Sequence, residues 1–372
     1  MMKILLTAYL DHNLGDDLFV DYFCKKYADH EVLLICDQEG ALNAQLEGNR
    51  NLRKIGLKAA VKIMPRVDAF VMIGGSIFQD IPEFHRYDVR RNILVTWARF
   101  LGARVYILGC NIGPIFSKRA IRTFKYCFFL ANKISVRDTA SIALLRAWKC
   151  RSNYVLAPDL IFSYPYVPRR ATTKKTPVLG ISVINIKPLS DQTGAYLRKL
   201  AQIVDRYLVE RADGIVRLFG FNGGAGNDGT AIERLVALTD GRNRGRIELH
   251  QYGSNSNLES FLDCFAECDF HICTRFHSLV LSLMYRIPYL PIAYSDKTTN
   301  LLHDIGYSAR SVDYAKMADL DAAEVTAEIL ARVGERLPDT DDLAKRSLVH
   351  FAALDEYIAA KMPTPTIGTV RR

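Results

Sequence analysis

The sequence predicts an α/β protein of two domains, each built on a parallel sheet, that face a central cleft. Short, apolar, β-rich runs alternate with helix-length amphipathic segments, which is typical of parallel sheets covered by helices on both faces. A polar stretch interrupts this alternation once, near the middle of the chain, and the pattern then restarts. The 372 residues, 49% hydrophobic and 24% charged, suit two globular domains. We therefore expect two Rossmann-like domains.

The first half of the chain has the composition of a complete domain. Strands are expected at 3–8, 32–36, 69–73, 104–108, 133–136 and 154–157, and helices at 16–27, 88–101, 118–131 and 138–148. Because each strand is followed by a helix-length segment, neighbouring strands are expected to run parallel. We assign residues 1–165 to an N-terminal Rossmann-like domain.

A linker at 166–177, polar and containing proline, leads to the second half. Strands are expected at 178–184, 215–221, 247–251, 270–273 and 289–293, and helices at 191–212, 228–238, 258–268 and 321–333. Residues 178–338 are therefore assigned to a C-terminal Rossmann-like domain. A C-terminal helix at 339–362 and a disordered tail at 363–372 complete the expected organisation.

Positive charge is concentrated in one region of a chain whose net charge is +9. Residues 84–170 contain 16 Lys and Arg but only three acidic residues. Such a region is either a solvated basic face or a site for anions or an inner membrane surface. Nucleic acid is not an expected partner, because no recognisable nucleic-acid-binding motif accompanies the charge.

Other features of the composition favour a cytoplasmic protein without a metal. No apolar run is long enough to cross a bilayer, and Asp11 and Asp16 follow the apolar start too closely for a signal peptide. Eight cysteines are too few for a disulfide scaffold. The spacing of Cys264, Cys268 and Cys273 matches no standard zinc pattern, so no metal site is expected.

The run Arg275-Phe276-His277 is the most informative part of the chain. It joins an expected strand to an expected helix, where backbone N–H groups favour anions. Arginine binds carboxylates and phosphates through two parallel hydrogen bonds, and histidine can move a proton near neutral pH. The run predicts a site for a small, multiply charged anion.

Three loops at strand ends in the first half predict a crevice beside this site. Glycine allows close approach of a ligand to the backbone, and parallel strands end at one edge of a sheet. Asp16 either caps the following helix or faces the cleft. None of the loops has the G-x-G-x-x-G pattern, so NAD is rejected. The loop residues are Asn13, Gly15 and Asp16, then Gly74, Gly75 and Ser76, and then Asn111 and Gly113.

Further strand-end residues extend the crevice. Arg137 follows the strand at 133–136 and is either free or paired with Asp138, which we expect to cap a helix through Ser141. Tyr294 and Lys297 follow the strand at 289–293, and Lys297 is either an anion ligand or an ordinary surface residue. The glycine-rich loop at 220–229 lacks the Lys-Ser/Thr of a P-loop and is expected to be a mobile lid.

Together these motifs resemble those of the polysaccharide pyruvyl transferase family, over roughly residues 3–305. Ser76 stands where a third glycine is usual, and Cys110-Asn111 where Gln-Ser is common; both lie in the N-terminal half. The matching motifs are Asn13-Leu14-Gly15-Asp16, Gly74-Gly75-Ser76-Ile77-Phe78, Gly109-Cys110-Asn111-Ile112-Gly113-Pro114, Ser135-Val136-Arg137-Asp138, Pro158-Asp159, Gly180-Ile181-Ser182, Arg275-Phe276-His277 and Tyr294-Ser295-Asp296-Lys297.

The resemblance implies a GT-B-like architecture with an acceptor-side N-terminal domain and a donor-side C-terminal domain. It implies phosphoenolpyruvate as donor and a pyruvate ketal across two hydroxyls of a sugar as product, without a nucleotide or other cofactor. The expected acceptor is a lipid-linked precursor of an exopolysaccharide or cell-wall glycan. The expected location is the cytoplasm, at the inner membrane face through the basic region 84–170.

The resemblance also assigns roles to individual residues. Arg275 and His277 match the element that contacts phosphoenolpyruvate, and Arg137 is the best match to an N-terminal arginine. We expect His277 to shuttle the proton, which requires a pKa near neutral. Asp16 would position or deprotonate the acceptor hydroxyl, and Lys297 would help to stabilise the departing phosphate. The other substrate-binding residues expected are Asn13, Gly15, Gly74, Gly75, Ser76, Asn111, Gly113 and Tyr294.

Two other functions remain open from the sequence. A nucleotide-sugar glycosyltransferase would share the architecture, although retaining members often carry two glutamates eight residues apart in the second half, and no such pair follows His277. A non-catalytic protein could bind anionic glycans or membrane lipid through the basic region.

Overall fold

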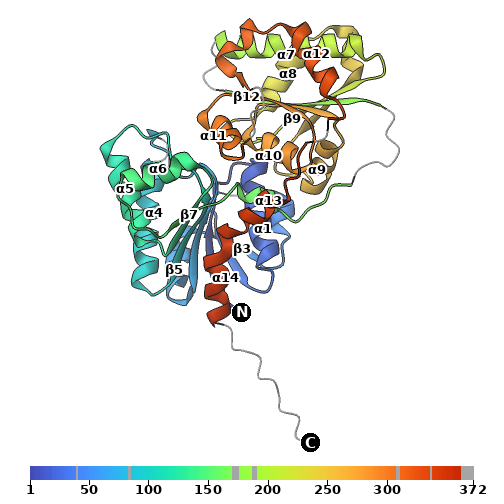
Figure 1. The fold of residues 1–372 in the computed structure, drawn as a ribbon. Coiled ribbons are helices and arrows are strands. Elements are labelled where there is room, and N and C mark those ends of the chain that lie inside the picture. The colour runs from blue at the N-terminus through green and yellow to red at the C-terminus, as the bar shows by residue number, and fades with distance from the viewer. Residues whose placement is uncertain are drawn as a thin grey trace, which may run out of the picture.

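The computed structural model describes residues 1–38, 41–82, 85–169, 176–186, 191–306, 311–335 and 337–361 and has two lobes, each with a parallel sheet (Figure 1). The first sheet has the strand order β3-β2-β1-β4-β5-β6-β7 and the second β10-β9-β8-β11-β12-β13. The strands of the first are β1 (Lys3–Thr7), β2 (Glu31–Ile35), β3 (Leu52–Ile55), β4 (Ala69–Ile73), β5 (Arg104–Cys110), β6 (Lys133–Val136) and β7 (Tyr154–Leu156). Those of the second are β8 (Val178–Val183), β9 (Ile215–Gly220), β10 (Ile247–Gln251), β11 (Phe270–Cys273), β12 (Tyr289–Ala293) and β13 (Val312–Asp313).

The predicted α/β alternation is confirmed, but the sequence missed two edge strands. β3 carries exposed Arg53 and Lys54 in its centre, so it lacks the apolar run expected of a strand. β13 is only two residues long. Edge strands are often short and charged because this hinders pairing with other chains. The same features hide them from a search for apolar runs.

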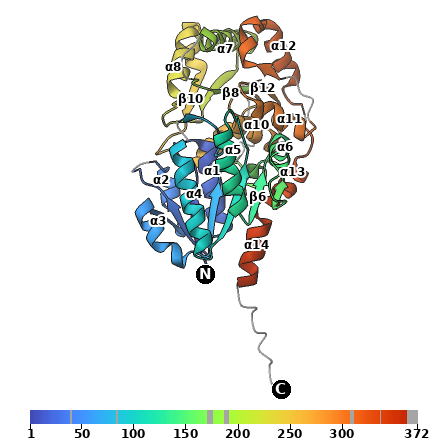
Figure 2. The same ribbon diagram turned by 90° about the vertical axis from the view of Figure 1, so that its left-hand side faces the viewer.

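Helices cover both faces of the first sheet. One face packs against α3 (Leu57–Ile63), α4 (His85–Phe100), α5 (Lys118–Leu130) and α6 (Thr139–Ala147). Figure 2 shows α4 and α5 side by side in front of this sheet. The other face packs against α1 (Leu14–Lys26) and α14 (Val349–Lys361). A short helix, α2 (Ala44–Glu47), precedes β3, and the 3-10 turns η1 (Met64–Arg66) and η3 (Leu160–Ser163) complete this lobe.

The expected C-terminal helix at 339–362 is two helices, α13 (Asp341–Ser347) and α14, with a break at Leu348. α14 returns to the first lobe, where Phe351 and Leu354 are fully buried in its core. The chain therefore crosses between the lobes a second time (Figure 1). The expected tail at 363–372 and much of the expected linker lie outside the described residues.

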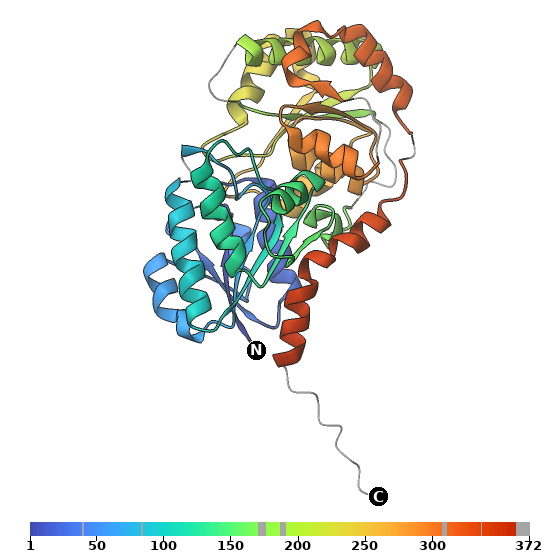
Figure 3. The same cartoon turned by 60° about the vertical axis from the view of Figure 1, so that its left-hand side comes forward.

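The second sheet is covered in the same way. α7 (Asp191–Glu210), α8 (Gly229–Leu238) and α12 (Ala322–Arg332) pack on its outer face, at the top of Figure 3. α9 (Leu258–Ala266), α10 (Phe276–Met284) and α11 (Asp296–Asp304) contribute to the core shared with the first lobe. The 3-10 turns η4 (Gly241–Arg246) and η5 (Tyr314–Asp319) join these elements. None of the helices described here is long and apolar enough to span a bilayer.

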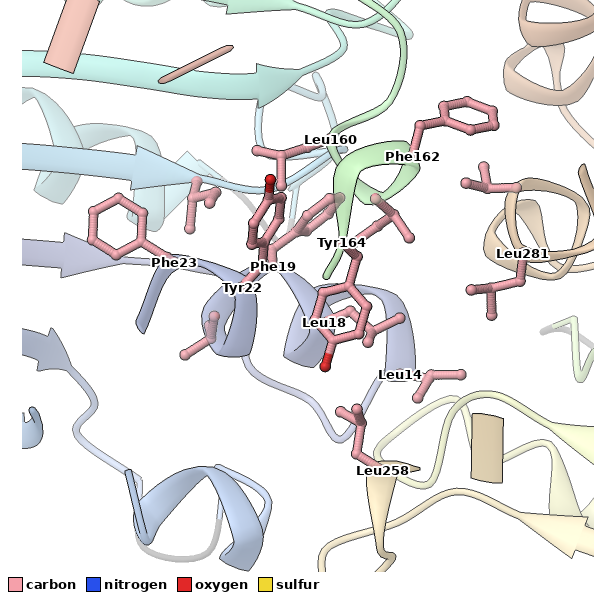
Figure 4. Packing of buried hydrophobic residues seen from close by; sticks show 14 of the residues in the cluster. Leu14, Leu18, Phe19, Tyr22, Phe23, Leu160, Phe162, Tyr164, Leu258 and Leu281 are labelled. Carbon is pink, nitrogen blue, oxygen red and sulfur yellow. The ribbon is translucent and has the colours of Figure 1, made fainter. Parts of the chain in front are cut away.

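A continuous apolar core joins the two lobes (Figure 4). Leu14 and Leu18 of α1 belong to the same buried cluster as Leu258 of α9 and Leu281 of α10. Burying such a side chain contributes about 1.5–3 kcal/mol. The backbone reinforces the junction, because the N–H of Leu14 donates to the carbonyl of Phe221 at 2.9 Å. The lobes therefore hold a fixed relation at the base of the cleft.

Candidate active site

A cavity of about 290 Å³ lies between the lobes, where strands of the two sheets end. Its volume is near the lower limit for small-molecule sites. Tyr9, Gln79, Ile81, Phe221, Asn222 and Phe276 form part of its wall. The structure also brings together most of the residues predicted from the sequence, namely Asn13, Asp16, Gly75, Ser76, Arg137, Arg275, His277, Tyr294 and Lys297.

His277 lies in the first turn of α10 and projects across the lobe boundary toward α1. Its ring packs edge-on against Phe19 and Phe276, with centroid distances of 5.3 and 5.2 Å. A Cβ atom on Gly15 would lie 1.7 Å from Nδ1 of His277. Gly15, predicted to bind substrate, instead makes room for the imidazole.

The imidazole is neutral at physiological pH in this structure. Nε2 of His277 is buried and has no hydrogen-bond partner among the described residues. Burial lowers its pKa to about 4; nearby Asp159 opposes the shift, and Arg137 and Lys297 add to it. The expectation of a pKa near neutral is therefore wrong for the site without substrate. An anionic ligand would supply the missing negative charge.

Arg275 is oriented by a buried carboxylate, Asp228, which the sequence did not single out. Nε of Arg275 donates to Oδ2 of Asp228 at 3.0 Å, and Nη2 pairs with Oδ1. The same Oδ2 accepts from the backbone N–H groups of Phe221 and Asn222, each at 3.0 Å. Asp228 thus connects the glycine-rich loop at 220–229, expected to be a mobile lid, to Arg275 in the wall of the cavity.

Arg137 approaches the cavity from the first lobe and pairs with Asp159 rather than with Asp138. Its Nη1 donates to Oδ2 of Asp159 at 2.7 Å, and both side chains are almost completely buried. The guanidinium carbon lies 4.2 Å from the ring centroid of Phe276, a favourable cation–π distance. Asp138 caps α6 as predicted, accepting from the N–H of Ser141 at 2.6 Å.

The glycine and asparagine loops support Arg137 from behind. Oδ1 of Asn111 accepts from Nη2 of Arg137 at 2.7 Å and from Oγ of Ser76 at 3.2 Å. A Cβ atom on Gly75 would lie 2.6 Å from the guanidinium, so only glycine leaves room for it. Gly74, with φ of 141°, shapes the turn before it.

Four residues predicted to bind substrate do not line the cavity: Gly15, Gly74, Asn111 and Gly113. Asn111 and Gly15 position catalytic candidates, as described above. The N–H of Gly113 donates to the carbonyl of Phe78 at 2.9 Å, which ties its loop to the neighbouring one. The sequence placed these residues at the correct sheet edge but could not separate lining residues from supporting ones.

Asp16 faces the cavity because another residue caps α1. Oδ1 of Asn13 accepts from the N–H of Gly15 at 3.0 Å and caps the helix. Burial raises the pKa of Asp16 to about 7, although Arg137 and Lys297 oppose the shift. Burial likewise lowers the pKa of Lys297 to about 8. Asp16 is thus a cavity-lining carboxyl whose pKa is raised to near neutral, which suits it to acid–base chemistry.

Asp159 and Asp228 are the main partners of the cavity's arginines that sequence reasoning left without a role. Asp159 follows a strand end directly after Pro158, and Asp228 ends a glycine-rich loop, so both carried a positional signal. Their partners lie far along the chain, and the sequence gives no means of pairing them. No group of three or more His, Cys, Asp and Glu side chains in the described part of the chain could hold a metal ion.

Comparisons with solved structures show the GT-B-like fold. Anabaena HepE, solved in complex with UDP, aligns with a TM-score of 0.56 at 12% identity, covering 97% of this chain and 99% of that chain. The galactosyltransferase WaaB of the lipopolysaccharide outer core gives 0.52 at 12% identity, covering 97% of this chain and 100% of that one. UDP-GlcNAc 2-epimerase from Methanocaldococcus jannaschii gives 0.60 at 9% identity, covering 95% and 99%.

Sequence comparisons identify the family. The amylovoran biosynthesis protein AmsJ of Erwinia amylovora is 20% identical over 307 residues, which cover 76% of this chain and 68% of AmsJ. The family model for polysaccharide pyruvyl transferase matches residues 13–296, which include every site residue named above except Tyr9 and Lys297. This chain belongs to the polysaccharide pyruvyl transferase family.

Proposed function

We propose that this protein transfers the pyruvyl group of phosphoenolpyruvate to two hydroxyls of a sugar and so forms a pyruvate ketal. The observation that carries the proposal is the half-buried imidazole of His277, whose buried Nε2 has no hydrogen-bond partner among the described residues, set among three cations in a cleft between the lobes. Arg137 comes from the first lobe, and Arg275 and Lys297 come from the second. Three converging cations suit a ligand with both a carboxylate and a phosphate.

The proposed donor would be held by these cations while the acceptor sits against the first lobe. Arg275 and Arg137 each keep one carboxylate partner, which fixes their orientation before substrate arrives. Such fixed cations stabilise charge that develops on a departing phosphate. Asp16 and Asn13 lie on the N-terminal side of the cavity, where we place the acceptor hydroxyls.

The proposed reaction conserves atoms and protons. Protonation of the methylene carbon gives a methyl group and an oxocarbenium-like carbon, which the first hydroxyl oxygen attacks. The bond from that carbon to the phosphate oxygen breaks, and the second hydroxyl closes the ketal. Of the two hydroxyl protons, one ends on the methyl group and the other on the released phosphate.

Two residues with displaced pKa values would move these protons. The negative charges of phosphoenolpyruvate would raise the pKa of His277 from about 4, so the imidazole gains its proton only in the substrate complex. Asp16, with a pKa raised by burial to about 7, would accept a proton from the acceptor hydroxyl. Phosphoenolpyruvate would thus have to bind before His277 could carry a proton.

The acceptor in this proposal is a lipid-linked precursor of an exopolysaccharide or cell-wall glycan at the inner membrane face. The basic region 84–170 supports this, because α5 exposes Lys118, Arg119, Arg122 and Lys125 on one surface. Cations on a surface attract the anionic lipids of a membrane. One basic residue of the region, Arg137, is buried in the site and does not belong to this surface.

Ligand-dependent melting and phosphate release test the proposed function. Phosphoenolpyruvate should raise the melting temperature, because a ligand at 100 times its Kd stabilises a protein by about 2.7 kcal/mol. Phosphate should be released only when a lipid-linked oligosaccharide is added. Stabilisation by UDP-sugars but not by phosphoenolpyruvate would instead favour a glycosyltransferase. Acceptor binding without phosphate release would favour a non-catalytic glycan-binding protein.

Asp16→Asn should lower kcat by about 100-fold or more and remove a titration from the pH–rate profile. In the wild type, the rate should rise as pH passes upward through about 7 and the carboxylate forms. Because burial raises the folded pKa above the ordinary value of an aspartate, the stabilising contribution of protonated Asp16 is lost between about pH 4 and 7. The variant should therefore be more stable than wild type at pH 8, by roughly 1–3 kcal/mol.

Asp17→Asn is the matched control for this experiment. Asp17 lies on the same helix, and burial also raises its pKa to about 7, but it does not line the cavity. Its Oδ2 accepts a hydrogen bond from Tyr252 at 2.7 Å. The rate should keep its rise near pH 7 in this variant. If Asp16→Asn keeps that rise as well, Asp16 is not the base.

A further inference from the structure

Three cavities, two in the first lobe and one in the cleft, share lining residues in series. The outermost is a groove of about 710 Å³ between α3 and α4, called here the α3–α4 groove. It shares Tyr87, Arg90 and Leu94 with an inner cavity of about 250 Å³. The inner cavity shares Tyr9 with the active-site cavity. A ligand that followed these shared residues would run from the α3–α4 groove past Tyr9 toward Asp16.

The outer end of this series of cavities is apolar and open to solvent. Val61 of α3 and Val89 and Ile93 of α4 are 39%, 50% and 61% exposed, and all three line the groove. Val89 and Ile93 are four residues apart, so they share one face of α4. Contiguous exposed apolar side chains mark binding surfaces more often than isolated ones do.

Arg86 lines the groove, and Arg90 lies where the groove meets the inner cavity. Arg86 is exposed and has no ion-pair partner among the described residues, and Arg90 pairs with Asp37 at 2.8 Å. On the opposite side, α3 exposes Lys58 and Lys62, one residue beyond the groove-lining Leu57 and Val61. An apolar channel that leads to cations fits a molecule with an apolar chain and an anionic group.

We propose that the α3–α4 groove binds the lipid of a prenyl-diphosphate-linked acceptor. The chain would lie against Val61, Val89 and Ile93, and the diphosphate would lie near Arg86 and Arg90. The sugar would then occupy the inner cavity, with its reacting hydroxyls beyond Tyr9 at Asp16. The sugar end of this assignment rests on the proposed function, whereas the lipid end rests on the groove alone.

The charge of this surface disfavours a second copy of the chain as its occupant. Arg86, Lys58 and Lys62 would face the same cations across an interface between two identical groove surfaces, and like charges in contact are destabilising. An anionic amphiphile has the complementary charge. A flat bilayer surface is the remaining candidate partner. It would contact the exposed side chains of the groove without entering the inner cavity.

Titration calorimetry with farnesyl diphosphate tests the groove without any acceptor sugar. Ile93→Glu and Val61→Glu should each weaken binding at least tenfold, because each places a carboxylate in the apolar channel. Both residues are exposed, so the fold should tolerate the change. Val209→Glu is the matched control, since Val209 is 69% exposed on α7 of the other lobe. The control should bind as the wild type does.

The anionic end has its own test. Wild type should bind farnesyl diphosphate at least tenfold more tightly than farnesol, and Arg86→Ala should reduce that difference. Equal binding in Ile93→Glu and wild type, or equal weakening in Val209→Glu, would overturn the proposal. So would unchanged farnesyl diphosphate binding in an Ile93→Glu variant that no longer binds vesicles of anionic phospholipid, because the surface would then be a bilayer contact.

The groove and the proposed function can fail separately. If farnesyl diphosphate binding depends on Ile93 but no phosphate is released from phosphoenolpyruvate, the function is wrong and the groove stands. If phosphate release proceeds and Ile93→Glu leaves KM for a lipid-linked acceptor unchanged, the function stands and the groove is wrong. In the expected result, Ile93→Glu raises that KM tenfold or more and leaves the melting shift with phosphoenolpyruvate unchanged.

Discussion

His277→Ala should lower kcat for phosphate release by 10²–10⁴-fold, the usual contribution of a positioned general acid or base. The affinity for phosphoenolpyruvate should change little, because Arg275 keeps its carboxylate partner Asp228 in the variant. The measurement is steady-state phosphate release together with the ligand-induced melting shift. His303→Ala is the control, since His303 is exposed on α11 of the same lobe. Unchanged release in His277→Ala would exclude the proton-transfer role.

Gly15→Ala gives an independent check on the same side chain. The added Cβ would lie 1.7 Å from Nδ1 of His277, so the imidazole must leave its position. We expect a loss of kcat close to that of His277→Ala. In the double variant the two losses should not add, because the methyl group then fills the space of an absent ring. Full activity in Gly15→Ala would show that the observed ring position is not the catalytic one.

Asp159→Ala should destabilise the protein by about 3–5 kcal/mol, the usual cost of leaving a buried charge without its partner. Asp159 is fully buried, and Arg137, only 6% exposed, pairs with it at 2.7 Å. Although burial opposes it, the charge of Arg137 and a hydrogen bond from the N–H of Ile161 hold the pKa of Asp159 below its ordinary value, so the carboxylate is the stable form. Urea unfolding at pH 7 measures the loss.

An exposed ion pair supplies the comparison for this loss. Glu210 of α7 pairs with Arg206 at 2.8 Å, and both side chains are well exposed to solvent. Glu210→Ala should change the free energy of unfolding by less than about 1 kcal/mol. The double variant Asp159→Ala, Arg137→Met should recover part of the stability lost in Asp159→Ala, because no unpaired charge remains. A loss in Asp159→Ala no larger than that in Glu210→Ala would contradict the assignment.

Where one rule was sufficient, the sequence predicted which residues lie near one another. The carboxyl ends of parallel strands meet at one edge of a sheet, so Asp16, Arg137 and Arg275 could be placed near a common cleft from strand positions alone. The cap of α6 by Asp138 was likewise predictable, because a helix start is a local feature. Each of these predictions depends on a short stretch of neighbouring residues or on the order of the strands.

Features that depend on how the lobes pack could not be predicted. Asp159 and Arg137 are separated by 22 residues, and Asp228 and Arg275 by 47, so neither pairing has a local signal. The lowered pKa of His277 results from burial against α1 of the other lobe, which no sequence pattern near residue 277 reveals. Gly15 was expected to contact the ligand, because its small size was explained by the loop in which it lies. The group that needs the space is His277, which comes from α10.

The apolar core that joins the lobes limits how this chain can be recombined with relatives. Leu14 and Leu18 belong by sequence to the first lobe, yet they pack in one cluster with Leu258 and Leu281 of the second. A chimera that combined this first lobe with the second lobe of a distant relative would pair two surfaces that do not come from one protein. α1, α9 and α10 would have to be exchanged as one unit for such a hybrid to fold and retain the geometry around His277.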